Sequence, residues 1–277
     1  MLNTQNHNRD HLGMTYVYPV VSRRAQGVSL GINLNVNNAC NWACIYCQVP
    51  NLTRGGPPPV NLSQLEDELK RSLTDIIHGD FLVKNAPPEA QRLADIAFSG
   101  NGEPTSAPEF AEAVARVVGE MQAFGLENSV KLRLITNGSL MHRPVVQQGI
   151  ALIGQQNGEI WFKVDHASEA GSKKINGIGR SAEQTRAALL LCAQHAPTWV
   201  QTCFFSIDGQ DADEPECLAY LDFIASVRTQ IHGVYLYGLA RPSMQPDAKR
   251  LSAFPHDSLQ IFAQRISSLG VKVIMTP

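Results

Sequence analysis

Three of the chain's six cysteines, Cys40, Cys44 and Cys47, fall within eight residues, in the stretch NNACNWACIYCQVP. Their spacing is typical of metal ligands, but zinc sites and ordinary iron-sulfur clusters take four protein ligands, and a disulfide takes two. A cluster of four irons and four sulfides on three cysteines would keep one iron open for a small molecule. The alternative is a non-catalytic zinc-binding module in which a distant histidine, for instance His78 or His166, completes the site.

The composition is that of a globular protein that can form a sizeable core: 277 residues, 44% hydrophobic and 17% charged. The formal net charge of -2 excludes an overall basic field of the kind that drives non-specific nucleic-acid binding. The N-terminal stretch is polar, and no apolar run approaches the roughly 20 residues that cross a bilayer. We therefore expect a cytoplasmic chain without a membrane partner, in which clustered cysteines indicate metal binding or catalysis.

The elements that position the cysteines follow from the hydrophobic pattern. Residues 1–14 are rich in Asn, His and Asp and are expected to form a flexible leader, followed by a single core domain at 15–277. Helix starts are indicated by capping-box patterns at Ser63 with Glu66 and at Ser181 with Gln184, and by Pro144. Apolar runs predict strands at 28–35, 95–100, 131–136, 159–165, 199–207, 233–240 and 271–275.

Strands that alternate with helices predict an α/β fold, in which parallel strands are joined by right-handed crossovers. The count is six strand-helix units and a seventh, closing strand. An open doubly wound sheet and a complete or partial barrel both fit this pattern. In either architecture the chemistry is expected at the carboxyl ends of the strands.

The unusual polar and glycine residues fall at these strand ends, so we expect them to form one pocket. The three cysteines follow the first predicted strand. Later strand ends carry Ser99, Gly100, Asn101, Gly102, Glu103 and Pro104, then Thr136, Asn137 and Gly138, then Asp165 and His166, and finally Arg241 and Pro242.

The CxxxCxxC motif, with Tyr46 directly before the third cysteine and after the first strand, resembles the signature of the radical S-adenosylmethionine (radical SAM) superfamily. The resemblance implies a single-domain partial (β/α)6 TIM-like barrel with a short closing seventh strand. It also implies a [4Fe-4S] cluster on the cysteines, S-adenosylmethionine (SAM) on the open iron, and Tyr46 among the residues that bind this cofactor. A flavodoxin or ferredoxin would supply an electron that cleaves SAM to a 5'-deoxyadenosyl radical, which abstracts hydrogen from substrate.

The segment GNGEP, Gly100 to Pro104, resembles the glycine-rich segment that binds the methionine end of SAM in this family. Glycines let a ligand approach the backbone, and the Glu103 carboxylate can accept hydrogen bonds from an ammonium group. Asn101 stands where glycine is common in the family.

Two further strand ends are assigned to the cofactor pocket. Thr136 and Asn137 resemble the family's turn after the third strand, which lines the cofactor or substrate pocket; Asn-Gly is also a plain turn signal. Asp165 is placed to accept hydrogen bonds from a ribose diol, although an aspartate at such a position also serves as a turn cap.

Within the superfamily, the stretches WFKVDHA, INGIGR, VQTCFF and LYGLARP resemble a group similar to wyosine-type tRNA-modifying enzymes, over residues 28 to 245. This resemblance identifies relatives rather than a substrate. Three substrate classes stay open: an RNA base, such as one in tRNA, a peptide, or a small molecule. Cys192, Cys203 and Cys217 are widely spaced and are expected to be buried thiols. The RGGPPP loop after the cysteines is expected to help cover the site.

Overall fold

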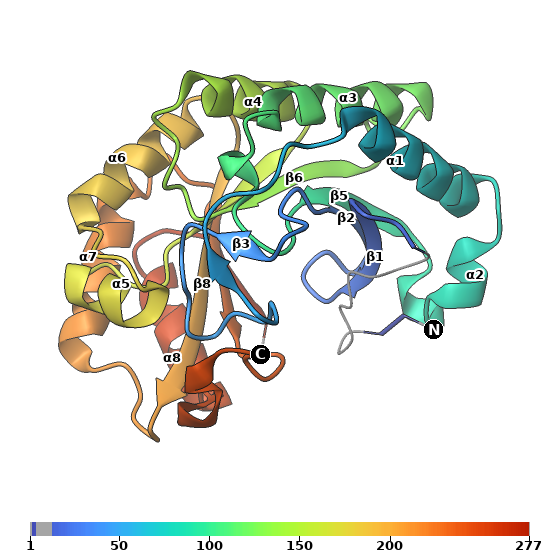
Figure 1. Cartoon of the computed structure of the whole chain (residues 1–277). Helices are drawn as coiled ribbons and strands as arrows, with labels where there is room; N and C mark the ends of the chain where they lie inside the picture. The colour runs from blue at the N-terminus through green and yellow to red at the C-terminus, as the bar shows by residue number, and fades with distance from the viewer. Residues whose placement is uncertain (1, 4–12, 277) are drawn as a thin grey trace.

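The computed structural model of the chain describes residues 2–3 and 13–276. The leader expected at residues 1–14 lies largely outside these residues, so it stays a prediction. One curved sheet runs in the order β1-β2-β5-β6-β7-β8-β9-β11, and the helices cover its convex outer side (Figure 1). Among the helices of the described residues, none combines the length and the apolar character needed to span a bilayer.

The elements have the following bounds. The strands of the curved sheet are β1 (Val17–Ser22), β2 (Gly27–Ile32), β5 (Leu93–Phe98), β6 (Lys131–Thr136), β7 (Glu159–Lys163), β8 (Thr198–Ile207), β9 (Gly233–Gly238), β10 (Leu251–Ala253) and β11 (Val273–Thr276), while β3 (Ala39–Cys40) and β4 (Thr53–Arg54) form a separate pair. The α-helices are α1 (Leu62–Ile77), α2 (Phe81–Asn85), α3 (Phe110–Ala123), α4 (Pro144–Gln155), α5 (Glu169–Asn176), α6 (Ala182–Ala193), α7 (Glu214–Val227) and α8 (His256–Ser267).

The predicted α/β partial barrel is confirmed. The seven predicted strands correspond to β2, β5, β6, β7, β8, β9 and β11, and each pairs in parallel with its neighbour. In the hydrogen-bonded order of the described strands, β11 ends the sheet beside β9 and does not reach β1. The sheet is therefore a half-barrel that stays open between its first and last strands.

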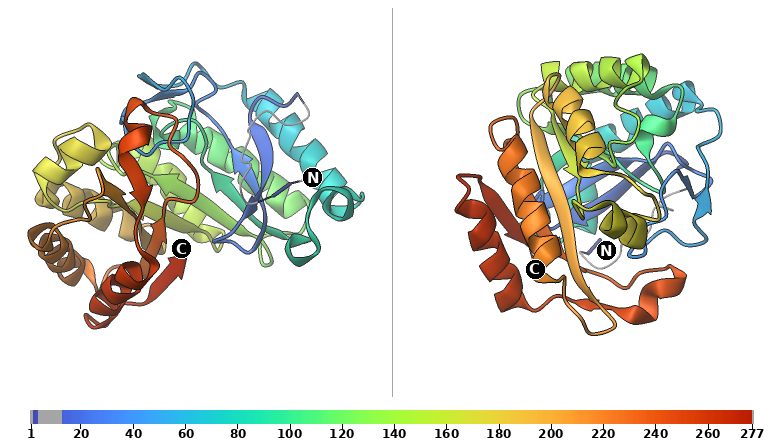
Figure 2. Two further views of the ribbon diagram at one scale, coloured as in Figure 1. Left: turned by 90° about the horizontal axis from the view of Figure 1, so that it is seen from below. Right: turned by 90° about the vertical axis from the view of Figure 1, so that its left-hand side faces the viewer.

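Two antiparallel strands were not predicted. β1 pairs with β2 as a hairpin whose turn covers residues 23 to 26, and β10 pairs with the far end of β8, the long gold strand in the right-hand view of Figure 2. β1 contains Pro19, which lowers strand propensity in sequence but is tolerated because β1 is an edge strand. The hairpin places its turn at the amino end of the parallel strands.

Helix caps were predicted with mixed success. The capping box of Ser181 and Gln184 is present at the start of α6. The one at Ser63 and Glu66 is wrong, because α1 begins at Leu62 and the side chain of Asn61 accepts a hydrogen bond from the backbone N–H of Gln64. Asparagine caps a helix as well as serine does, and the N-cap of α1 is two residues closer to the N-terminus than predicted.

The main hydrophobic core lies between the convex face of the sheet and the helices, with fully buried members such as Leu30, Leu69 and Phe110. Cys192, Cys203 and Cys217 are free and buried, as expected. A smaller aromatic cluster of Trp161, Trp199 and Tyr235 lies on strands β7, β8 and β9. The residues of the site come from the opposite, concave face.

A buried carboxylate on α1 anchors the edge hairpin. Glu68 accepts hydrogen bonds from the backbone N–H groups of Thr15 (2.9 Å), Tyr16 (2.7 Å) and Val17 (3.2 Å). These N–H groups stand at the entrance to β1. Buried backbone donors need partners, so this one side chain fixes where β1 begins.

We expect Glu68→Ala to lower the free energy of unfolding by about 2–4 kcal/mol, because it leaves several buried N–H groups without an acceptor. Urea unfolding followed by circular dichroism measures the loss. Asp67→Ala, at an exposed position of the same helix, is the matched control and should change stability by less than about 0.5 kcal/mol. Equal effects of the two substitutions would contradict the anchoring role.

Candidate functional site

A cavity of about 280 Å³ lies within the half-barrel and extends from the strand ends toward the middle of the sheet. Its lining includes Cys40, Cys44 and Cys47 together with Tyr46, the segment Gly100–Glu103, and Thr136 with Asn137. These residues come from three loops that follow β2, β5 and β6. The structure therefore brings together most of the residues that the sequence places in one pocket, Ser99 and Arg241 included. The exceptions, which do not line the cavity, are Pro104, Gly138, Asp165, His166 and Pro242.

The segment that carries the three cysteines, residues 33–61 between β2 and α1, is called the cysteine loop. It lies along the C-terminal end of α5. The backbone N–H groups of Ala43 and Ile45 donate to the carbonyl oxygens of Asn176 (3.0 Å) and Ile175 (2.9 Å). The Arg54 guanidinium, from β4, donates to the carbonyl oxygens of Asn41 and Gly177. The loop conformation is thus set by backbone contacts with a helix more than a hundred residues later in the chain.

The chain after β9 contacts the same loop from the other side. Ser243 Oγ donates to the carbonyl oxygen of Ile45 (2.7 Å), and the backbone N–H of Met244 donates to that of Cys47 (2.9 Å). Val49 and Leu52 of the loop line the cavity, whereas no residue of RGGPPP, residues 54–59, does so. The part of the loop that lines the cavity is therefore the stretch just before the expected cover.

Cys40 and Cys44 differ in environment from free surface cysteines. Burial raises the pKa of the Cys40 thiol to about 11 and that of the Cys44 thiol to about 12. The Asn176 side-chain amide donates to Cys44 Sγ (3.3 Å), and the backbone N–H of Trp42 donates to Cys40 Sγ (3.5 Å). Because metals bind the thiolate, binding at these positions would release protons.

The histidines proposed for a zinc site lie elsewhere. The His78 ring stacks on Phe124, with ring centres 5.9 Å apart, and His166 Nδ1 lies 3.0 Å from Glu216 Oε1. Neither histidine lines the cavity. In the described part of the chain, no group of three or more His, Cys, Asp or Glu side chains is arranged to hold a metal ion.

Tyr46 is the centre of a buried polar network. Its hydroxyl donates to Asp165 Oδ2 (2.6 Å) and accepts from Lys163 Nζ (2.6 Å). The Asn176 amide also donates to Asp165 Oδ2 (2.9 Å), and the backbone N–H of Cys203 donates to Oδ1 (3.1 Å). Burial, with the Asp165 carboxylate as a second cause, raises the pKa of Tyr46.

Asp165 therefore lies behind the cavity wall rather than in it. Its side chain is fully buried, and both carboxylate oxygens accept hydrogen bonds from protein groups. Through Tyr46 and Asn176 it joins the end of β7 to the cysteine loop.

Glu103 joins the loops after β5 and β6. Its Oε1 accepts from the hydroxyls of Thr105 (2.6 Å) and Thr136 (2.7 Å), and Oε2 accepts from the backbone N–H of Asn137 (2.7 Å). The side-chain amide of Asn137 in turn donates to Asn41 Oδ1 (2.8 Å), in the cysteine loop. Burial raises the pKa of Glu103, and the hydrogen bonds from these groups oppose that rise.

The glycines of GNGEP allow close packing against the cysteine loop. Gly100 has φ +134°, and a Cβ there would overlap the Asn33 side chain. A Cβ on Gly102 would overlap the carbonyl oxygen of Ala39, next to Cys40. Asn101, at the position where glycine is common in the family, donates a hydrogen bond from Nδ2 to Asn38 Oδ1 (2.6 Å).

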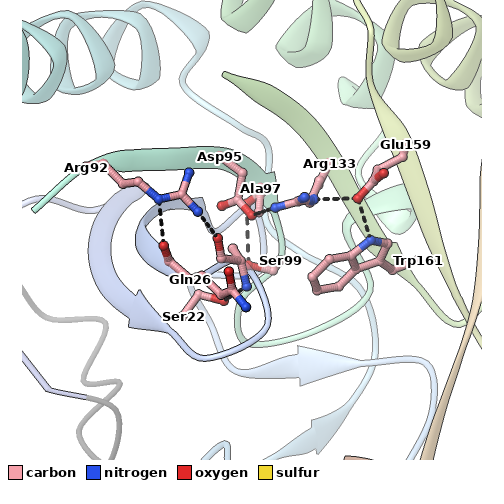
Figure 3. A network of polar contacts seen from close by, with 10 residues as sticks. Ser22, Gln26, Arg92, Asp95, Ala97, Ser99, Arg133, Glu159 and Trp161 are labelled. Atoms are coloured by element: carbon pink, nitrogen blue, oxygen red, sulfur yellow. Dashed lines mark hydrogen bonds and ion pairs between the residues drawn. The ribbon is translucent and has the colours of Figure 1, made fainter. Parts of the chain in front are cut away.

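The lower half of the cavity contains a polar network that the sequence did not indicate. Arg133 on β6 bridges Asp95 on β5 and Glu159 on β7, with Nε 2.7 Å from Glu159 Oε1 (Figure 3). The Trp161 indole N–H donates to the same Glu159 oxygen (2.9 Å). The available signal was the alternation of Asp95, Ala97 and Ser99 along β5, which puts all three on the concave face.

Comparison with known proteins gives the fold a context. No family model matches the chain. A Helicobacter pylori protein described only as "UPF0026 protein" is 31% identical over 134 residues, or 48% of this chain. The matched stretch spans 37% of that relative's length.

Solved structures that resemble most of the chain include the following two. A radical SAM methyltransferase from Sphaerobacter thermophilus has a TM-score of 0.58 at 13% identity, covering 96% of this chain and 78% of the other. SuiB from Streptococcus suis, bound to S-adenosylmethionine, has a TM-score of 0.55 at 9% identity, covering 91% of this chain and 47% of the other. The chain therefore shares its half-barrel fold with proteins of the radical SAM class.

We expect Tyr46→Phe to lower the free energy of unfolding by about 1–3 kcal/mol, because Asp165 and Lys163 then lose a buried partner. Chemical denaturation measures the change. Tyr235→Phe, whose ring packs beside Trp161 and Trp199, is the matched control and should be close to native. A Tyr46→Phe variant as stable as this control would show that the network does not hold the loop.

The raised pKa of Glu103 predicts a pH dependence of stability. An unfolded glutamate titrates near 4.5, so the folded state favours the protonated form, and that stabilisation is lost as pH rises from 4.5 through the raised pKa. Relative to Glu103→Gln, which cannot ionise, native protein should lose stability as the pH rises above 4.5. Urea unfolding at several pH values tests this, with exposed Glu112→Gln as control; parallel pH profiles of native protein and Glu103→Gln would disprove it.

Proposed function

We propose that this chain is a radical SAM enzyme in which Cys40, Cys44 and Cys47 hold a [4Fe-4S] cluster. SAM would bind against Gly100–Glu103 and against Thr136 with Asn137. One observation carries the proposal: a single cavity gathers these thiols and these two segments at the strand ends of a half-barrel. The fold shared with radical SAM proteins supports the same assignment.

The donor set suits an iron-sulfur cluster. Soft thiolates favour iron-sulfur clusters and zinc, and the two proposed histidine ligands for zinc lie outside the cavity. Cys203 packs with Tyr46 and Ile175 behind the cavity wall, and Cys192 lies in the helix layer. A cubane held by the loop alone would keep one iron for SAM.

When bound, the cluster and SAM would supply the chemistry, an electron transfer that releases methionine and a 5'-deoxyadenosyl radical able to abstract hydrogen from substrate. The chain's residues provide position. Glu103 Oε2 accepts one backbone N–H, which leaves this oxygen capacity for a donor such as the ammonium group of SAM. We assign Tyr46 and Asp165 to positioning the cysteine loop.

The cavity walls would also limit access of water to a reactive radical. The lining has apolar surface from Val20, Val49, Leu52 and Ile135, and Trp42 lines it beside the cysteines. A low-potential reductant is required, and we propose a flavodoxin or ferredoxin in the cytoplasm. The wyosine-type sequence resemblance leaves RNA, peptide and small-molecule substrates open.

Anaerobic reconstitution with iron and sulfide should give a brown protein that, with reductant and SAM, forms 5'-deoxyadenosine detectable by mass spectrometry. Ala at Cys40, Cys44 or Cys47 should reduce product to background, because each thiolate would hold a separate iron. Cys217→Ala on α7 is the matched control and should retain product. A colourless protein with stoichiometric zinc and no product would overturn the proposal in favour of a zinc module.

A further inference from the structure

The cavity is deeper than the proposed cofactor site requires. Along β5 the lining runs from Ser99 at the strand end to Asp95, four residues or about 13 Å lower at a rise of ~3.3 Å per residue. The upper part contains the cysteines and GNGEP. The lower part, which we call the lower chamber, is lined by Arg24, Asp95, Ala97, Arg133, Trp161, Gln201 and Tyr237.

Three of the cations that line the cavity, Arg24, Arg133 and Lys163, differ in how they are neutralised. Arg133 bridges two carboxylates (Figure 3), and Lys163 donates to Tyr46 and lies 4.0 Å from Asp165 Oδ2. Arg24 has no carboxylate within ion-pair distance among residues 2–3 and 13–276. It is thus a half-buried cation in a concave site that can take a new anionic partner.

The surroundings of Arg24 hold its guanidinium plane and leave donors free. The guanidinium carbon lies 4.8 Å from the ring centre of Trp161 and 4.8 Å from that of Tyr237. With its amide oxygen turned toward Arg24, Gln201 accepts hydrogen bonds from the guanidinium, at 3.2 Å from Nη2. A guanidinium has five N–H donors, so stacking on aromatic faces leaves part of the fork for a planar acceptor.

The turn that carries Arg24 is itself fixed. Arg92 donates from Nε to the carbonyl oxygen of Gln26 (2.8 Å) and from Nη2 to that of Ala25 (2.8 Å), and the Gln26 N–H donates to the Ser22 carbonyl (2.9 Å) (Figure 3). An ordered arginine loses much side-chain entropy, so anchoring both the turn and the guanidinium prepares it for a ligand.

Burial is the main cause that lowers the pKa of Arg24, and the Asp95 carboxylate acts in the opposite direction. A partly buried charge without a carboxylate at ion-pair distance is costly, and an anion bound to the guanidinium would relieve part of that cost.

Charge in the lower chamber favours a monoanion. Asp95 and Glu159 share the single cation Arg133, so this network carries one surplus negative charge close to Arg24. Asp95 Oδ1 is buried without a hydrogen-bond partner in the structure. A dianionic phosphate would be repelled by these carboxylates about twice as strongly as a carboxylate.

We infer that Arg24 binds a carboxylate group of the substrate in the lower chamber. The substrate is then a carboxylate-bearing small molecule or peptide, placed beneath the cofactor, rather than a nucleic acid held by its phosphates. SAM in the upper part of the cavity rests on the proposed function, whereas the carboxylate site depends only on the residues around Arg24.

Isothermal titration calorimetry with benzoate tests the inference on the full chain, both cluster-loaded with SAM and cluster-free. Native protein should bind benzoate, and Arg24→Gln should weaken binding at least about tenfold, as expected for loss of a charged hydrogen-bonding group. Arg24→Lys keeps the charge but not the fork and should be intermediate. Arg116→Gln, on the exposed face of α3, is the matched control and should bind as native protein does.

The outcomes separate the alternatives. No benzoate binding to native protein, or equal binding by native and Arg24→Gln, would overturn the inference. If phenyl phosphate binds more tightly than benzoate and its binding requires Arg24, the inferred carboxylate is wrong. The site would then take a phosphate group, as in a nucleotide or RNA. Urea unfolding checks that the Arg24→Gln and Arg24→Lys variants are folded. If Arg24→Gln is not folded, the benzoate affinity of Arg24→Lys relative to native protein is the test.

Failure of the proposed function is distinguishable from failure of this inference. The cluster-free titration does not depend on SAM cleavage. Arg24-dependent benzoate binding in a protein that forms no 5'-deoxyadenosine would leave the carboxylate site standing and contradict the enzyme class alone.

Discussion

The need of buried carboxylates for hydrogen-bond donors determines how the strand ends of this half-barrel are arranged. Glu103 takes its donors from the loops after β5 and β6, and Asp165 takes its donors from the cysteine loop, α5 and β8. Among the described residues, Glu103 has no lysine or arginine within ion-pair distance, and Asp165 has Lys163 at 4.0 Å. Both carboxylates therefore depend mainly on hydrogen-bond donors held by neighbouring loops. Three loops that would otherwise be mobile are thereby tied around one cavity.

The open sheet leaves space on its concave face. A closed barrel of this size fills its interior with side chains. Here the edge hairpin β1-β2 contributes its turn to one end, and small residues such as Ala97 and Ser99 leave space along β5. Charged groups at the bottom are neutralised within the Asp95–Arg133–Glu159 network, which lets the chain keep a polar chamber beneath the strand ends.

Much of the fold was readable from the sequence, because parallel strands and their covering helices have strong local periodicity. The edge strand β1 was missed, since VYPVVS is short and contains Pro19, and its pairing with β2 depends on a hairpin turn without a glycine-asparagine signal. The start of α1 was misplaced because Ser63 and Asn61 are equally acceptable caps and only packing chooses between them.

In the candidate site, too, some positions could be predicted from the sequence and others could not. Residues at strand ends could be gathered from topology alone, which is why the cysteines, GNGEP and Thr136 with Asn137 were placed in one pocket. The position of Asp165 behind the wall depends on Tyr46, 119 residues away in sequence, and no local pattern encodes that contact. Arg24 could not be found because its location follows from the hairpin that was missed.

In the proposed enzyme, three thiolates hold a cluster whose fourth iron is open to SAM. Electron paramagnetic resonance of the reconstituted, reduced protein, recorded with and without SAM, tests it most directly. We expect the signal of a reduced [4Fe-4S] cluster, with g-values that change when SAM is added. A cluster signal indifferent to SAM, or no signal from a protein that instead binds zinc, would contradict it.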